Sequence, residues 1–324
     1  MEPIETGTEE ELQADIVHHL PTVLLEIMYE YARSAFPSYA TKWNIGEHDV
    51  LQFINIDKKL VFVDVEERET LSDPDMYVLD CETGSMNTWP FPRCYGLAHH
   101  GLSGTVFISS VSVSADEKNS IFLATDEGIL KKSELVGEIF GQLKPCSEGV
   151  VCLSRQMGTI IVFNTEGIKL RSFDVYVRNE YEQESGDICF SVGWVDGEEF
   201  VFIGTRLFGE GSVVNMYDLT TGLVRRFWKL EGLLLTLEFY SQYELLYSIV
   251  QNNEEYEEHE ERQWLWYAWD PRSDAIVEEH LKERTTFSQC GISVPYSGTP
   301  LLYCGTDCRC YLSLSGIIYG LEWL

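Results

Sequence analysis

The sequence predicts an all-β fold, and two observations support this prediction. After about residue 45, apolar and polar residues alternate in short runs, which is typical of strands with one buried face. A unit of apolar strand, small polar turn and second strand also recurs five times. The turns of the first three units combine Asp or Asn with Gly, which close tight hairpins, whereas the fourth uses Asp270 to Asp274 and the fifth Ser313 to Gly316. The recurring segments are MYVLDCETGSMNTWPF, TIIVFNTEGIKLRSFDV, VNMYDLTTGLVRRFWKL, LWYAWDPRSDAIVEEHL and CYLSLSGIIYGLEWL.

Two further strands precede each hairpin, so each unit contains four antiparallel strands. The clearest unit extends from Asp187 to Leu230, with strands ICFSVGWV, FVFIGTRLF, SVVNMYDL and LVRRFWKL. Four strands at a period in the forties are the signature of a β-propeller blade. We therefore predict a β-propeller of about six four-stranded blades, with seven as the alternative. The predicted units are 49–92, 93–135, 136–176, 187–230, 232–282 and 288–324.

The ends of the third strands carry a resemblance to the WD-repeat propellers. In that family the third strand ends in a Trp-Asp pair, and this chain has Trp269-Asp270. Tyr217-Asp218, Leu79-Asp80 and Phe163-Asn164 occupy equivalent places, whereas the Gly-His that opens a typical repeat is missing. The resemblance implies a divergent propeller and leaves open whether the family's Asp-His-Ser/Thr-Trp side-chain network is present.

The segment before the predicted propeller contains an amphipathic helix within HHLPTVLLEIMYEYA. Pro21 suits the first turn of a helix, and the apolar residues from Leu24 to Tyr31 recur at helical spacing on one face. The stretch FPSYATKWNIG then breaks the helix. We predict an N-terminal helical segment over 1–44 and a propeller over 45–324.

The start of this helix resembles the opening of an F-box, which begins with Leu-Pro and continues with apolar residues on one face. The resemblance implies binding to a Skp-type adaptor of a cullin ubiquitin ligase, with the propeller binding the substrate. Val23 departs from a position that is usually acidic, and Trp43 is the only candidate for the closing tryptophan of the motif. The alternative is a helix that packs against the propeller. The candidate partner-binding residues are Leu20, Pro21, Leu24, Leu25, Met28 and Tyr31.

The charge of the chain disfavours several classes of partner. The net charge is −30, from 53 acidic and 23 basic side chains, so the protein repels phosphate backbones and anionic lipid headgroups. We expect no nucleic acid and no membrane partner, because the longest apolar runs are also too short to span a bilayer. The nine scattered cysteines and the acidic N-terminus predict a reduced intracellular protein, cytoplasmic or nuclear.

Two acidic clusters and one sulfur-rich cluster are candidate sites. The stretch NNEEYEEHEERQW between two strands predicts an exposed loop, either simply solvated or a docking site for a basic protein segment. A second acidic insertion, VRNEYEQESGD, lies at 177–187. The cluster CGTDCRC is interpreted as a cysteine-rich hairpin rather than a metal site, because zinc requires four ligands. The candidate docking residues are Glu254, Glu255, Glu257, Glu258, Glu260 and Glu261.

No motif predicts catalysis. His99 and His100 lie outside any metalloprotease or nucleophile-elbow pattern, and FGEGS lacks the lysine of a phosphate-binding loop. We expect no cofactor and a non-enzymatic interaction scaffold, with an F-box-type substrate receptor as its specific form. The alternatives are a structural subunit anchored by the N-terminal helix into a larger assembly, and a propeller enzyme or small-ligand binder with its site at the central channel.

Overall fold

The computed structural model describes sixteen stretches of the chain, which contain all the elements discussed below. The predicted N-terminal helix with its partner-binding residues (Leu20 to Tyr31) lies outside the described residues, and so do the six glutamates of the predicted acidic docking loop. The described residues are 38–46, 48, 50–64, 76–89, 94–110, 119–125, 128–135, 142–154, 158–175, 188–207, 211–251, 264–272, 281–286, 300–304, 310–314 and 316–322.

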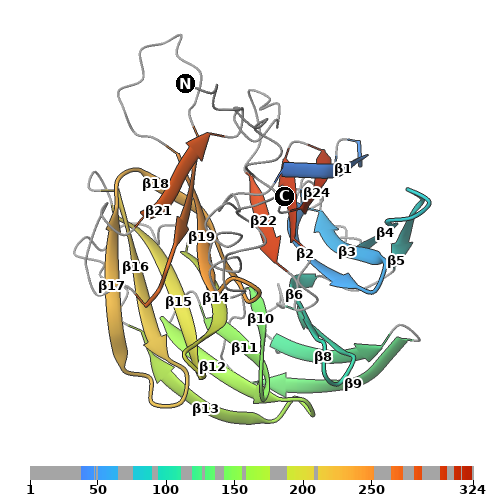
Figure 1. The fold of residues 1–324 in the computed structure, drawn as a ribbon. Helices are drawn as coiled ribbons and strands as arrows, with labels where there is room; N and C mark the ends of the chain where they lie inside the picture. The colour runs from blue at the N-terminus through green and yellow to red at the C-terminus, as the bar shows by residue number, and fades with distance from the viewer. Residues whose placement is uncertain are drawn as a thin grey trace, which may run out of the picture.

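The described residues form six separate antiparallel sheets of four strands each, arranged as the blades of a ring (Figure 1). Blades 1 to 3 follow the chain in simple order. Blade 1 contains β2 (Val50–Ile56), β3 (Lys59–Asp64), β4 (Met76–Asp80) and β5 (Met86–Trp89). Blade 2 contains β6 (Cys94–His100), β7 (Thr105–Ser110), β8 (Asn119–Thr125) and β9 (Gly128–Leu135). Blade 3 contains β10 (Leu143–Cys146), β11 (Gly149–Ser154), β12 (Thr159–Asn164) and β13 (Lys169–Asp174).

The other three blades complete the ring, and the last one combines both ends of the described chain. Blade 4 contains β14 (Ile188–Val195), β15 (Glu198–Leu207), β16 (Gly211–Asp218) and β17 (Val224–Leu230). Blade 5 contains β18 (Leu233–Tyr240), β19 (Leu245–Gln251), β20 (Trp264–Trp269) and β21 (Leu281–Thr286). Blade 6 contains β22 (Leu301–Cys304), β23 (Cys310–Leu314), β24 (Ile317–Glu322) and β1 (Ser38–Asn44).

The prediction of six four-stranded blades is confirmed, and the seven-blade alternative is wrong for the described residues. The six predicted units match the six sheets closely, because the hairpins of blades 1, 3, 4 and 5 carry their own turn signals. Blade 6 differs from its prediction. The turn at Gly316 joins the second and third strands of this blade, β23 and β24, rather than the third and fourth.

The fourth strand of blade 6 is β1, which pairs antiparallel with β24 from Ser38↔Glu322 to Asn44↔Ile317. Ser38–Asn44 therefore belongs to the propeller, seven residues before the predicted boundary at 44/45. Trp43 packs in this strand, with its ring 6.3 Å from that of Tyr311. The residue considered as the closing tryptophan of an F-box is thus part of blade 6.

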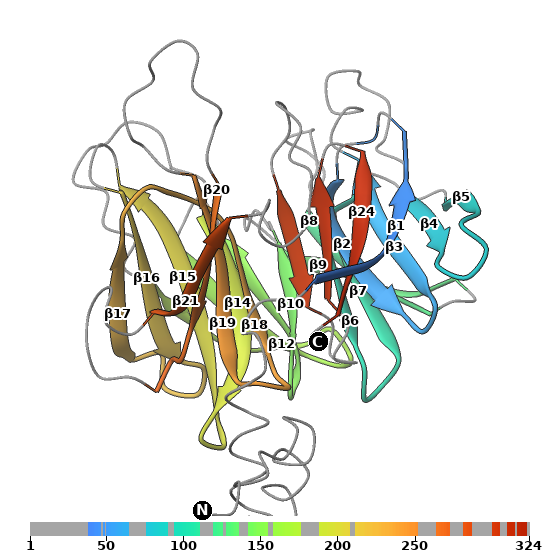
Figure 2. The ribbon, with the colours of Figure 1, turned by 45° about the horizontal axis from the view of Figure 1, so that its top comes forward.

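The first strands of the blades surround a central channel, and each contacts the first strands of its two neighbours. Because strands alternate in direction, the turns from first to second and from third to fourth strand lie on one face of the ring. We call it the turn face; residues 57–58, 147–148 and 219–223 belong to it. The opposite face is called the loop face. The strands that flank the two acidic insertions, 252–263 and 176–187, end and begin at the loop face (Figure 2).

The turns after the third strands use the predicted chemistry. The side-chain oxygen of Asp80 accepts hydrogen bonds from the backbone N–H groups of Glu82 and Thr83, and Asp218 does the same two and three residues ahead. Asn164 and Asp270 also accept backbone hydrogen bonds within their own turns. These four residues are the ones that the sequence comparison places at the ends of third strands, and each lies at or directly after the end of the third strand of its blade.

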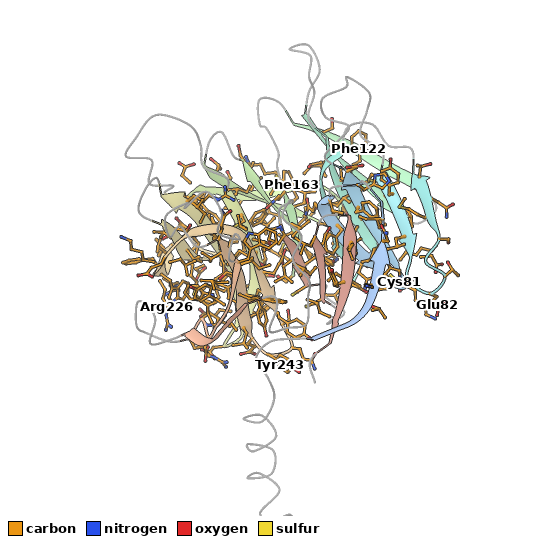
Figure 3. The ribbon with its side chains drawn as sticks, turned by 90° about the horizontal axis from the view of Figure 1, so that it is seen from above. Cys81, Glu82, Phe122, Phe163, Arg226 and Tyr243 are labelled. Carbon is orange, nitrogen blue, oxygen red and sulfur yellow. The ribbon has the colours of Figure 1, made fainter. Side chains whose placement is uncertain are left out.

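Apolar and aromatic side chains between the sheets hold the ring together (Figure 3). Phe202 of blade 4 stacks on Phe239 of blade 5 with ring centres 5.5 Å apart and nearly parallel planes. Trp228 of blade 4 meets Trp269 of blade 5 edge to face at 6.2 Å. Each such buried aromatic side chain contributes about 1.5–3 kcal/mol by leaving water. The channel is therefore bounded by a rigid wall.

Two polar pairs lie within this core. The indole N–H of Trp269 donates a buried hydrogen bond of 2.9 Å to the Ser248 hydroxyl on the neighbouring strand. His48, between β1 and β2, has its Nδ1 2.5 Å from a carboxylate oxygen of the buried Asp64 at the end of β3, and its ring lies 4.3 Å from that of Tyr77. The first pair joins β20 to β19 within blade 5. The second pair joins the connection between β1 and β2 to the end of β3 in blade 1.

Candidate functional site

A cavity of about 530 Å³ opens at the turn-face end of the central channel. Its volume lies in the range of pockets that hold small ligands, ~300–1,000 Å³. Every blade contributes to its wall with residues on or next to its first strand. We call this cavity the channel funnel, and one lining residue from each blade in order is Asn55, His99, Lys144, Ser191, Glu238 and Tyr303.

A buried ion pair crosses the funnel between blades 3 and 5. The Lys144 ammonium donates to the Glu238 carboxylate, and both side chains are almost completely removed from solvent. The ammonium also lies 6.0 Å from the centre of the Tyr303 ring. Ser191, on the first strand of blade 4, donates to the second carboxylate oxygen of Glu238 at 3.3 Å and accepts the backbone N–H of Phe239 at 2.8 Å. Three blades are thereby joined at the floor of the funnel.

Burial raises the pKa of Glu238, because a carboxylate loses its hydration in this position. The neighbouring Lys144 ammonium and the Ser191 hydroxyl act in the opposite direction by favouring the charged form. Removal of either partner would leave a charge in a dry environment, which is far more costly than the pair itself. The free energy of unfolding therefore depends on whether Glu238 is protonated.

A second carboxylate, that of Glu199, lies higher in the funnel wall. The backbone N–H and the hydroxyl of Ser147 donate to its two oxygens at 2.7 and 2.6 Å, so the residue connects blade 4 to the first turn of blade 3. Burial raises the pKa of Glu199 in spite of these two hydrogen bonds. Asp57 adds a third carboxylate at the turn of blade 1.

A buried glutamine connects three blades next to the funnel. The amide nitrogen of Gln52 in blade 1 donates to the carbonyls of Leu97 at 2.7 Å and Leu143 at 2.9 Å, and its oxygen accepts the Leu97 N–H at 3.1 Å. Gln52 also lines a second cavity of about 30 Å³, which shares Lys144, Glu238 and Tyr303 with the funnel. The funnel is therefore a pocket with a charged floor.

Aromatic side chains form part of the funnel wall. Trp194, at the end of β14, is 44% exposed although it is a large apolar side chain. Beside it, Gly193 allows Phe239 to approach, because a Cβ atom at this position would lie 2.1 Å from the phenyl ring. The wall thus presents one exposed indole ring next to a fixed phenyl ring.

Exposed apolar side chains surround the funnel on the turn face. Leu102 is 91% exposed, Leu223 62% and Ile168 51%. Ile168 and Leu223 occupy equivalent turn positions in neighbouring blades, where their carbonyls accept the N–H groups of Asn164 and Asp218. The exposed large apolar residues of the described chain are Met86, Leu102, Ile168, Leu170, Trp194, Leu223, Val224 and Phe227, and most lie in or next to turns of this face.

The structure brings few of the predicted site residues together. His99 and His100 both line the funnel, and His100 is buried with its Nδ1 2.8 Å from the Ser103 hydroxyl. The predicted cysteine-rich hairpin is formed by β22 and β23, in which Cys304 lies opposite Cys310. The six cysteines for which side chains are described are all free thiols. Within the described stretches, no three His, Cys, Asp or Glu side chains are grouped as a metal ion would require.

The residues that form the funnel floor are not evident from the sequence. Lys144 and Glu238 lie far apart in the sequence, and each is the single charged residue of its strand. The alternation of LTLEFY did signal that Glu238 shares a face with Thr236. That signal says which face of the strand is polar, but only the closed ring shows that this face lines a channel.

The fold and the site define a six-bladed β-propeller whose central channel opens on the turn face as a polar funnel. No family model matches the chain, and no curated protein is detectably similar to it in sequence. Solved structures are similar in fold. Hydrazine synthase of Kuenenia stuttgartiensis has 12% sequence identity and a TM-score of 0.55, covering 84% of this chain and 75% of that one.

Two further structures have similar folds. A protein of unknown function from Bacteroides caccae has 11% identity and a TM-score of 0.49, covering 75% of this chain and 79% of that one. Streptogramin B lyase has 12% identity and a TM-score of 0.49, covering 90% of this chain and all of that one. At these identities the similarity concerns the fold alone. No helix in the described part of the chain has the length and hydropathy needed to cross a bilayer.

Proposed function

We propose that this chain is a non-enzymatic protein-interaction scaffold whose turn face binds a partner protein. The observation that carries the proposal is the group of exposed apolar side chains around the funnel. Ile168 and Leu223 are both exposed and lie in equivalent turns of the neighbouring blades 3 and 4, which are in contact where Arg171 donates to the Leu219 carbonyl at 3.0 Å. Contiguous exposed apolar surface on a soluble domain typically marks an interface.

We further propose that the N-terminal segment acts as a docking module for a Skp-type adaptor, which makes the chain an F-box-type substrate receptor. The support is that all six sheets are complete with residues from Ser38 onward, so no strand of the ring has to come from Leu20 to Tyr31. Because Trp43 is used by blade 6, the module is confined to residues before Ser38 and lacks the closing tryptophan of the motif.

We also propose that the propeller is a divergent relative of the WD-repeat propellers, because two side-chain pairs match parts of that family's hydrogen-bond network. The Trp269–Ser248 hydrogen bond corresponds to the Trp and Ser members of the family's side-chain network, and His48–Asp64 corresponds to its His and Asp members. The two halves lie in different blades, blade 5 and blade 1, which suits a divergent relative. Free thiols at all six described cysteines also support a reducing compartment, cytoplasmic or nuclear.

A pull-down with a purified Skp-type adaptor tests the docking module. We expect the wild-type chain to retain the adaptor and a Leu24→Asp/Met28→Asp variant to lose it. The matched control is Glu26→Gln/Glu30→Gln on the other side of the predicted helix, which should bind like wild type. If the wild type does not retain the adaptor, the ubiquitin-ligase role is wrong.

A second measurement separates the scaffold from a subunit of a larger assembly. We expect partners of a substrate receptor to depend on the turn face, so Ile168→Glu/Leu223→Glu should reduce their recovery while Thr220→Glu, a polar change in the same turn, should not. Co-purification of one stoichiometric partner that is unaffected by both the turn-face and the helix variants would favour an assembly subunit.

A further inference from the structure

We propose that the channel funnel is a binding site for an organic cation, a guanidinium or alkylammonium group. The cation is either the side chain of a basic peptide or a free small amine, since both present the same chemistry. Where the cation belongs to a peptide, the inference rests on the proposed interaction at the turn face. As a site for a small amine it stands on the funnel alone.

The charges of the funnel favour a positive ligand. Its lining contains three carboxylates, from Asp57, Glu199 and Glu238, and one lysine, Lys144. Lys144 is already paired with Glu238, so the remaining field comes from the other two carboxylates. They belong to blades 1 and 4, which lie on opposite sides of the ring (Figure 1), and both line the funnel. The net charge of −30 attracts cations toward the molecule as a whole.

An anion is disfavoured by the same arrangement. An anion would have to draw Lys144 away from Glu238, which would leave a buried carboxylate without its cation. Lys144 is also held on its other side by the Tyr303 ring. The floor of the funnel therefore offers no cation for an incoming anion to use.

The wall supplies the second component of a cation site. Trp194 lines the funnel and is 44% exposed to solvent overall, and indole is the strongest of the aromatic partners for a cation. Gly193 and Phe239 fix the strand end that carries it. Glu199 is held by two hydrogen bonds from Ser147, so its carboxylate does not have to be ordered when a ligand binds. A planar guanidinium combines stacking on an aromatic ring with pairing to a carboxylate.

Isothermal titration calorimetry with two cationic probes and one uncharged control peptide tests the inference. The peptide acetyl-Gly-Gly-Arg-Gly-Gly-amide is compared with the same peptide carrying citrulline, which is uncharged and similar in shape, and with agmatine as the free guanidinium. We expect the arginine peptide, agmatine or both to bind the full-length wild-type chain, with no detectable binding of the citrulline peptide. Binding of agmatine identifies a small-amine site; binding of the peptide alone identifies a peptide partner.

Variants place the binding in the funnel. Trp194→Ala and Glu199→Gln should each weaken binding by about three- to thirtyfold, the range of a partly desolvated cation–π or charge contact. Glutamine at 199 keeps an acceptor for the Ser147 N–H, and Trp194 is half-exposed, so both variants should fold. The matched controls are Phe227→Ala, an exposed aromatic on the outer strand of the same blade, and Glu82→Gln at the periphery of the ring (Figure 3).

The inference is overturned by any of three results. These are no binding of either cationic probe at millimolar concentration, equal binding of the citrulline peptide, or equal weakening by the control variants. If agmatine binds and the arginine peptide does not, the funnel is a site for small cations and takes no part in the proposed interaction with a partner protein. Loss of adaptor binding in the pull-down would leave the funnel result unchanged, so the two proposals fail separately.

Discussion

The Lys144–Glu238 pair makes a quantitative prediction about stability. The side chains are 11% and 6% exposed, so the pair is effectively buried. Two unit charges about 4 Å apart attract by roughly 4 kcal/mol at an effective dielectric constant near 20. Lys144→Met removes this attraction and leaves Glu238 with only the weaker hydrogen bond from Ser191. We expect the free energy of unfolding at pH 7 to fall by about 3–5 kcal/mol.

The double variant Lys144→Met/Glu238→Leu should recover most of that loss, because no charge then remains in the floor. Urea unfolding followed by tryptophan fluorescence measures all variants, with m-values compared to verify that the change lies in stability. A double-mutant cycle then gives the coupling between the two residues. If the single and double variants lose the same amount, the two side chains do not act as a pair.

The effect of pH provides an independent check on the same variant. Burial raises the pKa of Glu238 above its value in the unfolded chain, so the folded state binds the proton more tightly. For an acid shifted in this direction, stability falls as pH rises from the unfolded pKa, near 4.5, toward the folded one. The loss caused by Lys144→Met should therefore shrink between pH 7 and pH 5. A loss of less than about 1 kcal/mol at pH 7, or one that does not change with pH, would refute the reasoning.

Three further predictions follow from individual contacts. Ser248→Ala removes the acceptor of the buried Trp269 N–H and should cost about 1–3 kcal/mol in urea unfolding. Because burial raises the pKa of Glu199, the stability of Glu199→Gln relative to wild type should increase as pH rises from about 4.5 to 7. Burial also raises the pKa of the Cys146 and Cys189 thiols to about 12, so neither should react with a thiol reagent in the native protein at pH 8.

Each of these predictions has its own control. Ser172→Ala, on an exposed face of β13, should change stability by less than about 0.5 kcal/mol. A pH-independent difference between Glu199→Gln and wild type would contradict the assignment of a buried carboxylate. For the thiols, unfolding in urea should make both residues reactive, and rapid labelling of either one before unfolding would show that the strand is open to solvent.

The fold could be predicted because its signals are local. The hairpins of blades 1, 3 and 4 each carry their own Asp or Asn and their own Gly, and Asp80, Asn164 and Asp218 cap their turns as the sequence indicates. The predicted start of the propeller at residue 45 is too late, because the strand before it pairs with a strand far away in the sequence. SYATKWN has no partner nearby in the sequence, and it becomes a strand only because blade 6 lacks a fourth strand next to β24.

The site could be predicted much less well than the fold. Its residues come from six blades, and nothing in the neighbourhood of Lys144 indicates that Glu238 will lie beside it. The position of His99 in the funnel was equally hidden, because its sequence context is that of any strand end. The pocket forms only when the ring closes and brings polar residues from six first strands together. Which residues face one another across it depends on the number of blades.

The pairing of β1 with β24 has a consequence for how the protein is made. The strand at Ser38–Asn44 leaves the ribosome first among the described strands, and its partner at Ile317–Glu322 leaves last. During synthesis the other five sheets can form as soon as their own strands have emerged, whereas the sixth must wait for β24. Until then the early strand has an unpaired backbone edge that other chains can bind. The ring therefore closes only after residues 317–322 have emerged, and chains truncated before Ile317 should aggregate more readily than the full chain.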